Sequence, residues 1–166
     1  TDEEIEAVAE VLRSGWWGQG PKTAEFEQQF TAFVGSPLAV AVNSATAALH
    51  LALALVDVEG AEVISTPMTF VSTNHAILYN RATPVFADIQ ADTLNIDPED
   101  VERRITPRTK AIMAVDYGGH PADLDRLMAL ARAHNLTLIE DAAHAAGSLY
   151  RGRPVGSNEP AASPPR

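Results

Sequence analysis

The chain has 166 residues, of which 46% are hydrophobic and 20% are charged, and its formal net charge at pH 7 is −10. These proportions indicate a globular chain rather than a disordered one. The acidic balance argues against a general nucleic-acid binder, which needs a basic face. Cysteine is absent, which excludes disulfides, zinc–thiolate sites and cysteine nucleophiles. The sequence shows no signal peptide and no apolar run of roughly 18 residues, so we expect a cytoplasmic protein.

Residues 1–35 form the first predicted segment, which contains two helices. Apolar residues recur at helical spacing from Ile5 to Leu12, and Gly15 is expected to end this helix. A second helix follows a glycine- and proline-marked loop and is expected to end at Gly35. We therefore treat this segment as separate from the rest of the chain.

Short apolar runs alternate with helical stretches from residue 38 onward. The predicted strands are residues 38–42, 62–65, 84–87, 111–115 and 137–140, and the predicted helices are residues 45–56, 70–80, 98–105 and 121–134. Strands that alternate with helices imply βαβ units, a mostly parallel sheet and a three-layer αβα architecture. Because the helix at 45–56 is apolar nearly all round, we expect it to be buried on most sides.

The alternating pattern defines a large domain over residues 36–156. The last residues, 157–166, differ from it, because they carry three prolines and no hydrophobic periodicity. We expect this end to be a disordered or aberrant tail.

Three predicted strand ends carry side chains suited to ligand binding, since ligands in open α/β sheets gather outside the carboxyl ends of the strands. At the first, Ser44, Ala45 and Thr46 open a helix, where backbone N–H groups and the helix dipole attract an anion. Ordinary helix capping by Ser44 or Thr46 is the alternative explanation.

The other two strand ends carry an aromatic ring and a carboxylate. Phe70 lies at a strand-to-helix junction, where it could stack on a flat ligand or simply belong to the core. Asp141 ends a strand three residues before His144, and its carboxylate could pair with a cationic ring nitrogen or cap the next turn. An anion site, an aromatic platform, a carboxylate and an imidazole together suit a flat cofactor with a phosphate arm.

Ordered short motifs cover nearly all of residues 15–156. They are Gly20-Pro21, Phe26-Glu27, Asn43-Ser44-Ala45-Thr46-Ala47-Ala48-Leu49-His50, Pro67-Met68-Thr69-Phe70, Pro84-Val85-Phe86-Ala87-Asp88, Asn95-Ile96-Asp97-Pro98, Ile105-Thr106-Pro107-Arg108-Thr109-Lys110-Ala111-Ile112, Gly119-His120-Pro121-Ala122-Asp123, Ile139-Glu140-Asp141-Ala142-Ala143-His144 and Tyr150-Arg151-Gly152. In this order and spacing they resemble the sugar aminotransferases of the DegT/DnrJ/StrS type, which use pyridoxal 5'-phosphate (PLP) and have fold type I.

The resemblance implies an incomplete PLP-transferase-like large domain and a role for each matched residue. Ala45 and Thr46 would hold the cofactor phosphate, and Phe70 would stack on the pyridine ring. Asp141 would pair with the ring nitrogen and keep it protonated, and His144 would contact the ring near its phenolic oxygen. The cofactor-binding residues expected from the resemblance are Ser44, Ala45, Thr46, Phe70, Asp141 and His144, with no metal ligand among them.

The resemblance also implies a reaction, the transfer of an amino group from an amino acid, usually glutamate, to a nucleotide-linked keto sugar. Such enzymes serve amino-sugar, cell-surface polysaccharide or antibiotic biosynthesis. They hold PLP on a lysine that follows the Asp-Ala-Ala-His segment. The two lysines of this chain, Lys22 and Lys110, stand in other contexts, so no catalytic residue is assigned.

We therefore expect the N-terminal part of an aminotransferase, inactive by itself and homodimeric when complete. Two alternatives remain open. One is a lysine-free binding or regulatory protein on the same fold. The other is an unrelated nucleotide-binding domain, which finds little support because neither a Walker A motif nor Gly-x-Gly-x-x-Gly is present.

Overall fold

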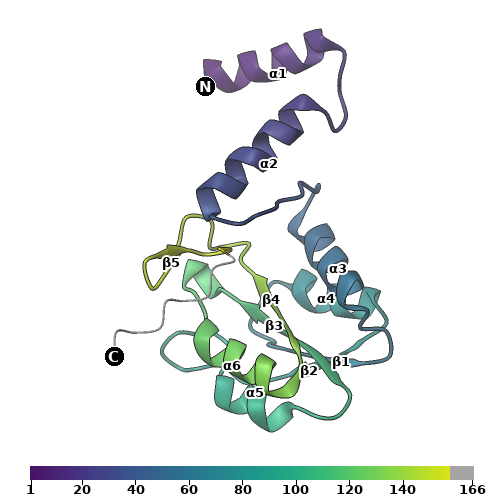
Figure 1. Cartoon of the computed structure of the whole chain (residues 1–166), viewed down its shortest axis with the longest axis vertical. Helices are drawn as coiled ribbons and strands as arrows, with labels where there is room; N and C mark the ends of the chain where they lie inside the picture. The colour runs from purple at the N-terminus through teal and green to yellow at the C-terminus, as the bar shows by residue number, and fades with distance from the viewer. Residues whose placement is uncertain (158–166) are drawn as a thin grey trace.

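The computed structural model describes residues 1–157, and a four-stranded parallel sheet is their centre (Figure 1). The strand order is β2-β1-β3-β4, formed by β1 (Glu62–Ser65), β2 (Thr83–Phe86), β3 (Thr109–Val115) and β4 (Thr137–Asp141). A small antiparallel ribbon of β5 (Leu149–Tyr150) and β6 (Arg153–Pro154) follows. The helices are α1 (Asp2–Ser14), α2 (Pro21–Val34), α3 (Ala45–Val56), α4 (Val71–Tyr79), α5 (Pro98–Arg104) and α6 (Leu124–His134), with a 3-10 turn, η1, at Tyr117–Gly119.

Helices cover both faces of this sheet, as the predicted three-layer architecture requires. Val63 of β1 and Met113 of β3 pack with α3 and α4, while the next residue of β1, Ile64, packs with α5 and α6 on the opposite face. This alternation follows from the strand period of two. The apolar side chains on each face of the sheet form one buried cluster. Leu53 of α3 belongs to the first cluster and Leu127 of α6 to the second, and both are 0% exposed.

Four of the five predicted strands are confirmed with small shifts at their ends. The edge strand β2 begins at Thr83, one residue early, and contains Pro84. A proline lacks a backbone N–H, and an edge strand tolerates that loss because one of its sides has no partner. The helix predicted at 121–134 begins later, at Leu124, because the side chain of Asp123 accepts from the backbone N–H of Arg126 and caps it there.

The strand predicted at residues 38–42 is wrong, because the structure has no strand there. Leu38 and Val40 are 81% and 77% exposed. The backbone N–H of Ala41 donates to the side chain of Glu27, at 2.7 Å, instead of to another strand. An apolar run becomes a strand only beside a second backbone that pairs with it, and no strand among residues 1–157 lies alongside this run.

The prediction that the helix at 45–56 is buried on most sides is also wrong. Leu49 and Leu53 of α3 pack on the sheet, but Leu51 and Leu55 are 51% and 88% exposed. A helix on the outer layer of a sheet buries one face, and within the described residues nothing covers the other face of α3.

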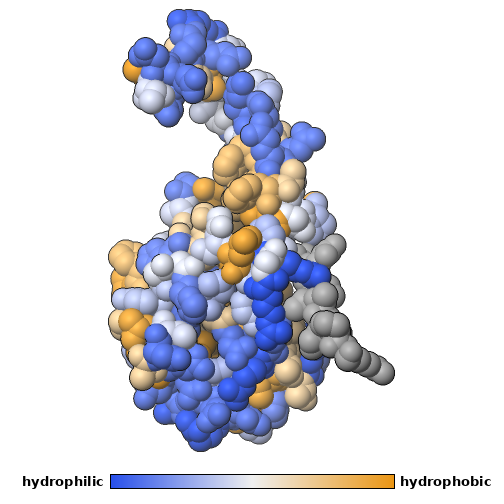
Figure 2. All heavy atoms as spheres, turned by 90° about the vertical axis from the view of Figure 1, so that its left-hand side faces the viewer, coloured by the Kyte–Doolittle hydropathy of each residue, from blue (hydrophilic) through white to orange (hydrophobic). Residues whose placement is uncertain are grey.

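The helices α1 and α2 project away from the sheet (Figure 1), and α1 has no buried residue. Both end as predicted, at Gly15 and Gly35, whose positive φ angles of 74° and 75° suit glycine. Figure 2 shows apolar surface between these helices and the sheet. Phe33 of α2 is 59% exposed.

In the described part of the chain no helix is long and apolar enough to cross a membrane. The tail predicted at 157–166 lies outside the described residues except for Ser157, and the division of the chain at residue 35 stays a prediction.

Candidate cofactor site

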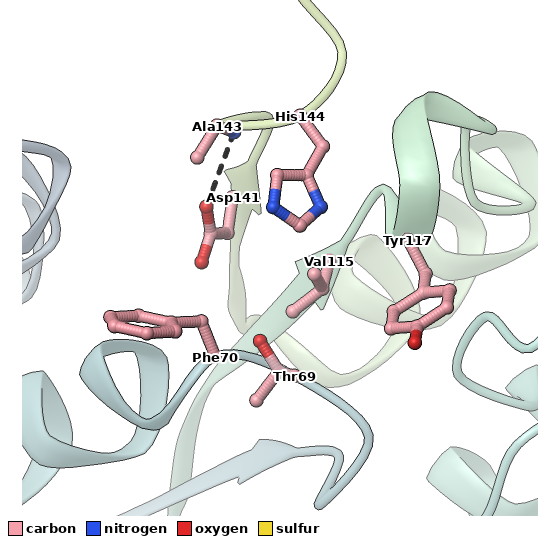
Figure 3. Close-up of a pocket in the computed structure, with 7 residues that line it drawn as sticks. All are labelled: Thr69, Phe70, Val115, Tyr117, Asp141, Ala143 and His144. Carbon is pink, nitrogen blue, oxygen red and sulfur yellow. Dashed lines mark hydrogen bonds between the residues drawn. The ribbon is translucent and has the colours of Figure 1, made fainter.

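Loops from three adjacent strands line one pocket at the carboxyl edge of the sheet (Figure 3). Thr69 and Phe70 follow β1, Val115 ends β3, and Asp141 ends β4. Tyr117 of η1 and the segment just after β4, with Ala143 and His144, complete the lining. Parallel strands place their carboxyl ends at one edge, which is why segments far apart in the chain meet here. The hollow encloses about 270 Å³ of empty space, part of which is open solvent. These residues therefore form one wall of a site rather than an enclosed cavity.

The Asp141 side chain is 8% exposed and is held at both oxygens. Its Oδ2 accepts from the hydroxyl of Thr73 in α4 at 2.7 Å, and its Oδ1 accepts from the backbone N–H of Ala143 at 3.3 Å. The hydroxyl of Thr73 also lies 2.8 Å from that of Thr69. The bond to Ala143 is the turn capping that the sequence left open, and the bond to Thr73 adds a second fixed contact. The carboxylate is therefore oriented before any ligand arrives.

Phe70 and His144 present their rings to the same hollow (Figure 3). Phe70 is 71% exposed, so the alternative that it belongs to the core is wrong. It stands at the N-cap of α4 with an extended backbone, which projects it from the strand-to-helix junction. A phenyl ring that stays exposed beside a buried carboxylate is suited to stack on a planar ligand.

The start of α3 is linked to this pocket through α4. The side chain of Ser44 caps α3 by accepting from the backbone N–H of Ala47, at 3.2 Å, so the capping explanation is confirmed for Ser44. The hydroxyl of Thr46 donates to that of Ser72, at 2.8 Å, one residue before the Thr73 that fixes Asp141. Residues 44–46 do not line the pocket itself. The N–H groups of Ala45 and Thr46 lie in the first helical turn, where no carbonyl of the same helix can bind them.

The structure thus brings together three of the six predicted residues, Phe70, Asp141 and His144, in one pocket. The sequence reasoning missed Thr73 and Tyr117. The signal for Thr73 was present, since Thr69 and Thr73 are four residues apart at the start of a helix that follows a strand end. Tyr117 carries no comparable signal, because its position depends on the turn after β3.

The turn after β3, η1, lies close to the segment that carries His144. The backbone N–H of Tyr117 donates to the side chain of Asn95 at 2.9 Å. At Gly119, where φ is 85°, a Cβ atom would lie 2.9 Å from the backbone oxygen of His144. Only glycine permits both the backbone angle and this approach. The turn is therefore packed directly against the segment that carries His144.

Neither lysine of the chain reaches the pocket. Lys22 lies in α2 and pairs with Glu10 and Glu25. Lys110 lies near the amino end of β3 and binds the backbone oxygen of Asp57. Val115, at the other end of β3, lines the pocket, and five residues of strand span about 16 Å. The pocket lining therefore offers a carboxylate and the rings of Phe70, Tyr117 and His144, without an amine.

The model of the DegT/DnrJ/EryC1/StrS aminotransferase family matches residues 1–163. The chain belongs to this family. The resemblance drawn from the motifs and the expected fold are thus confirmed, because solved relatives of this family share the mostly parallel sheet.

Three relatives show the extent of the match. The spore coat polysaccharide biosynthesis protein SpsC of Bacillus subtilis is 53% identical over 156 residues, which cover 93% of this chain and 40% of SpsC. A putative sugar aminotransferase of Streptococcus pneumoniae, Spr1654 in its PLP form, superimposes with a TM-score of 0.90 and 39% identity over 95% of this chain and 44% of its own. An aminotransferase of Psychrobacter cryohalolentis superimposes with a TM-score of 0.90 and 42% identity, over 94% of this chain and 40% of its own. The chain therefore spans about two fifths of its relatives' length.

Proposed function

We propose that this chain provides the ring-binding wall of a PLP-dependent aminotransferase. The observation that carries the proposal is the Asp141 carboxylate, buried at the end of β4, fixed by Thr73 and bordered by the exposed ring of Phe70. A fixed carboxylate beside a flat apolar surface is complementary to a protonated pyridine ring.

The residues of the pocket fit PLP. Asp141 would accept a hydrogen bond from the ring nitrogen and hold its proton there. Phe70 would cover one face of the ring and exclude water from it, and His144 would orient the ring from its oxygen-bearing side. When bound, PLP supplies an electron sink for breaking bonds at the amino-bearing carbon. Membership of an aminotransferase family and the PLP form of a solved relative support this assignment.

The start of α3 would hold the phosphate group of the cofactor. The free N–H groups of its first turn, at Ala45 and Thr46, and the positive end of the helix dipole both attract an anion. The bond between Thr46 and Ser72 would keep this helix start at a fixed distance from Asp141, through Thr73. The same helix can be capped by Ser44 and bind an anion, because capping uses only one of its free N–H groups.

The donor would be an amino acid, with glutamate proposed, and the acceptor a nucleotide-linked keto sugar. The support is the names of the relatives, which include a spore coat polysaccharide biosynthesis protein and a sugar aminotransferase. We also propose that the complete enzyme is a cytoplasmic homodimer. The 166-residue chain alone would be inactive, because the pocket contains no amine to hold the cofactor covalently or to move a proton between carbons.

The test uses pyridoxamine phosphate (PMP), which lacks the aldehyde of PLP and cannot react with surface lysines. Binding of PMP to the 166-residue chain would be measured by calorimetry for the wild type, Asp141→Asn and the control Asp92→Asn. Asp92 is an exposed carboxylate outside the pocket. We expect saturable binding that Asp141→Asn weakens at least roughly tenfold, since a hydrogen bond to a charged group contributes about 1.5–3 kcal/mol, and that Asp92→Asn leaves unchanged.

Equal affinity of the wild type and Asp141→Asn for PMP would overturn the proposal. The alternative of a lysine-free binding protein on the same fold predicts the same binding result. A second measurement separates the two functions. The wild-type coding region is read beyond codon 156 in all frames for a lysine that follows a Ser-Phe-Ser-like stretch, and its absence would favour the lysine-free protein.

A further inference from the structure

Two carboxyl groups meet beneath the pocket, on the face of the sheet opposite Asp141. Glu140 precedes Asp141 in β4, and successive strand residues point to opposite faces. Asp141 faces Thr73 of α4, so Glu140 faces the layer of α5 and α6. Asp116 follows Val115, the residue that pairs with Asp141, and its Oδ1 accepts from the backbone N–H of Ala122 just before α6, at 2.9 Å. Glu140 pairs with Ala114, two residues before Asp116, so the ends of β3 and β4 place Asp116 and Glu140 as diagonal neighbours on one face, where the charge of each acts on the other.

One buried oxygen of each carboxyl group has no donor among the described residues. Asp116 is 0% exposed and Glu140 is half-buried. Asp116 Oδ2 and Glu140 Oε1 are both buried, and no hydrogen-bond partner for either exists among the described residues. Two ionised carboxylates can only accept, so they cannot satisfy each other, and a single proton would make one of them a donor. Leaving both charged and unpaired in a buried position would be costly.

The surrounding groups favour the bound proton. Burial raises the pKa of Glu140 to about 8, and the neighbouring charge of Asp116 adds to this. Burial is also the main cause of the raised pKa of Asp116, and the negative charge of Asp141 adds to it. Other groups act in the opposite direction. The pKa of Asp116 is lowered by the backbone N–H of Ala122, by Glu140 and, least, by His120, which follows η1. The pKa of Glu140 is lowered by the backbone N–H of Gly156, which follows β6.

We infer that Asp116 and Glu140 share one proton in the folded chain and act as a positioning pair that ties the end of β3 to β4 under the pocket. The backbone N–H of Asp116 donates to the backbone oxygen of Asp141 at 3.1 Å, and Tyr117 of the pocket lining follows directly. The shared proton therefore fixes the backbone positions of Asp141 and Tyr117, which both line the pocket. Loss of this proton puts two anions in contact and loosens the junction.

The test is a pH titration of the 166-residue chain by NMR, with ¹³C-labelled side-chain carboxyl groups and ¹⁵N-labelled backbone. We expect one carboxyl group of the pair to remain protonated at neutral pH and to lose its proton near pH 8. The amide signals of Asp116, Tyr117 and Asp141 shift with the same midpoint. In Glu140→Gln, whose amide donates to Asp116 permanently, these signals stay in their low-pH positions across the range. The exposed carboxylate variant Glu102→Gln keeps the wild-type titration.

Titration of every carboxyl group below pH 5 in the wild type would overturn the inference, and so would a high-pH transition that survives in Glu140→Gln. If Glu140→Gln does not fold, the wild-type titration and the variant Asp116→Asn decide by the same criteria. The consequence for the cofactor rests on the proposed function: above pH 8, PMP affinity falls more steeply in the wild type than in Glu140→Gln. The NMR titration contains no cofactor, so a chain that titrates as expected but does not bind PMP contradicts only the proposed function.

Discussion

The sheet domain and the N-terminal helices differ in how their apolar residues are used. In the sheet domain Leu53 and Leu127 are 0% exposed, packed on opposite faces of the sheet. In α1 the apolar residues Ile5, Val8 and Leu12 have the same helical spacing but are 59–69% exposed. A periodic pattern thus determines which elements form, whereas burial requires a second surface. The two regions should therefore respond differently to the same kind of mutation.

The largest expected contrast comes from removing a leucine side chain in each region. Leu127→Ala leaves a cavity between α6 and the sheet and should lower the free energy of unfolding by about 2–5 kcal/mol. Leu12→Ala, in the exposed stripe of α1, should change it by less than about 0.5 kcal/mol. Urea unfolding followed by circular dichroism measures both. Similar losses of unfolding free energy in the two variants would show that α1 packs against another surface in solution. The two regions would then not differ in burial.

The pH dependence of stability should arise in the sheet domain. Folding raises the pKa of Glu140 from 4.5 to about 8, so the folded state keeps a proton that the unfolded state releases. The stabilisation is complete below pH 4.5 and is lost as the pH rises through about 8. Between these values the free energy of unfolding should fall by up to about 1.4 kcal/mol per pH unit, the slope for one proton.

Urea unfolding at a series of pH values measures this slope. Glu140→Gln should flatten it, and the exposed control Glu102→Gln should keep it. A slope in Glu140→Gln equal to that of the wild type would show that other groups cause the pH dependence.

A smaller difference in stability is expected between valine substitutions at two threonines, Thr73 in α4 and Thr31 in α2. Thr73→Val removes the hydroxyl that binds Asp141 and should cost about 1 kcal/mol of stability, whereas Thr73→Ser keeps the bond. Thr31→Val in α2 removes only a hydroxyl that donates to the backbone oxygen of Gln28, and should have little effect on unfolding. In PMP binding, Thr73→Val should weaken affinity and Thr73→Ser should not. Equal binding by the valine and serine variants would show that Thr73 does not orient Asp141.

The same contrast explains what the sequence could predict. The alternation of strands and helices predicted four strands and the sheet, because each of these strands has a neighbour within the chain. The run at 38–42 has the same apolar character but no neighbouring strand, so it stays irregular. The prediction that α3 is buried on most sides failed for a similar reason, since Leu55 has no surface to pack against among the described residues.

Local motifs predicted three of the seven residues that line the pocket. Phe70, Asp141 and His144 follow strand ends, and parallel strands bring such positions together. Thr73 and the Asp116–Glu140 pair were not predicted, because their roles depend on which face of the sheet each side chain occupies. That information comes from packing, and Glu140 in the sequence looks like any polar residue at the end of a strand.

Asp141 is proposed to hold the proton of the cofactor ring nitrogen, and NMR of PMP labelled with ¹⁵N at that nitrogen tests this role most directly. PMP bound to the wild-type chain should give the chemical shift of a protonated ring up to a pH well above that at which free PMP loses this proton. PMP bound to Asp141→Asn should lose the proton at lower pH than in the wild type. A bound ring nitrogen that titrates identically in the wild type, in Asp141→Asn and in free PMP would contradict the account.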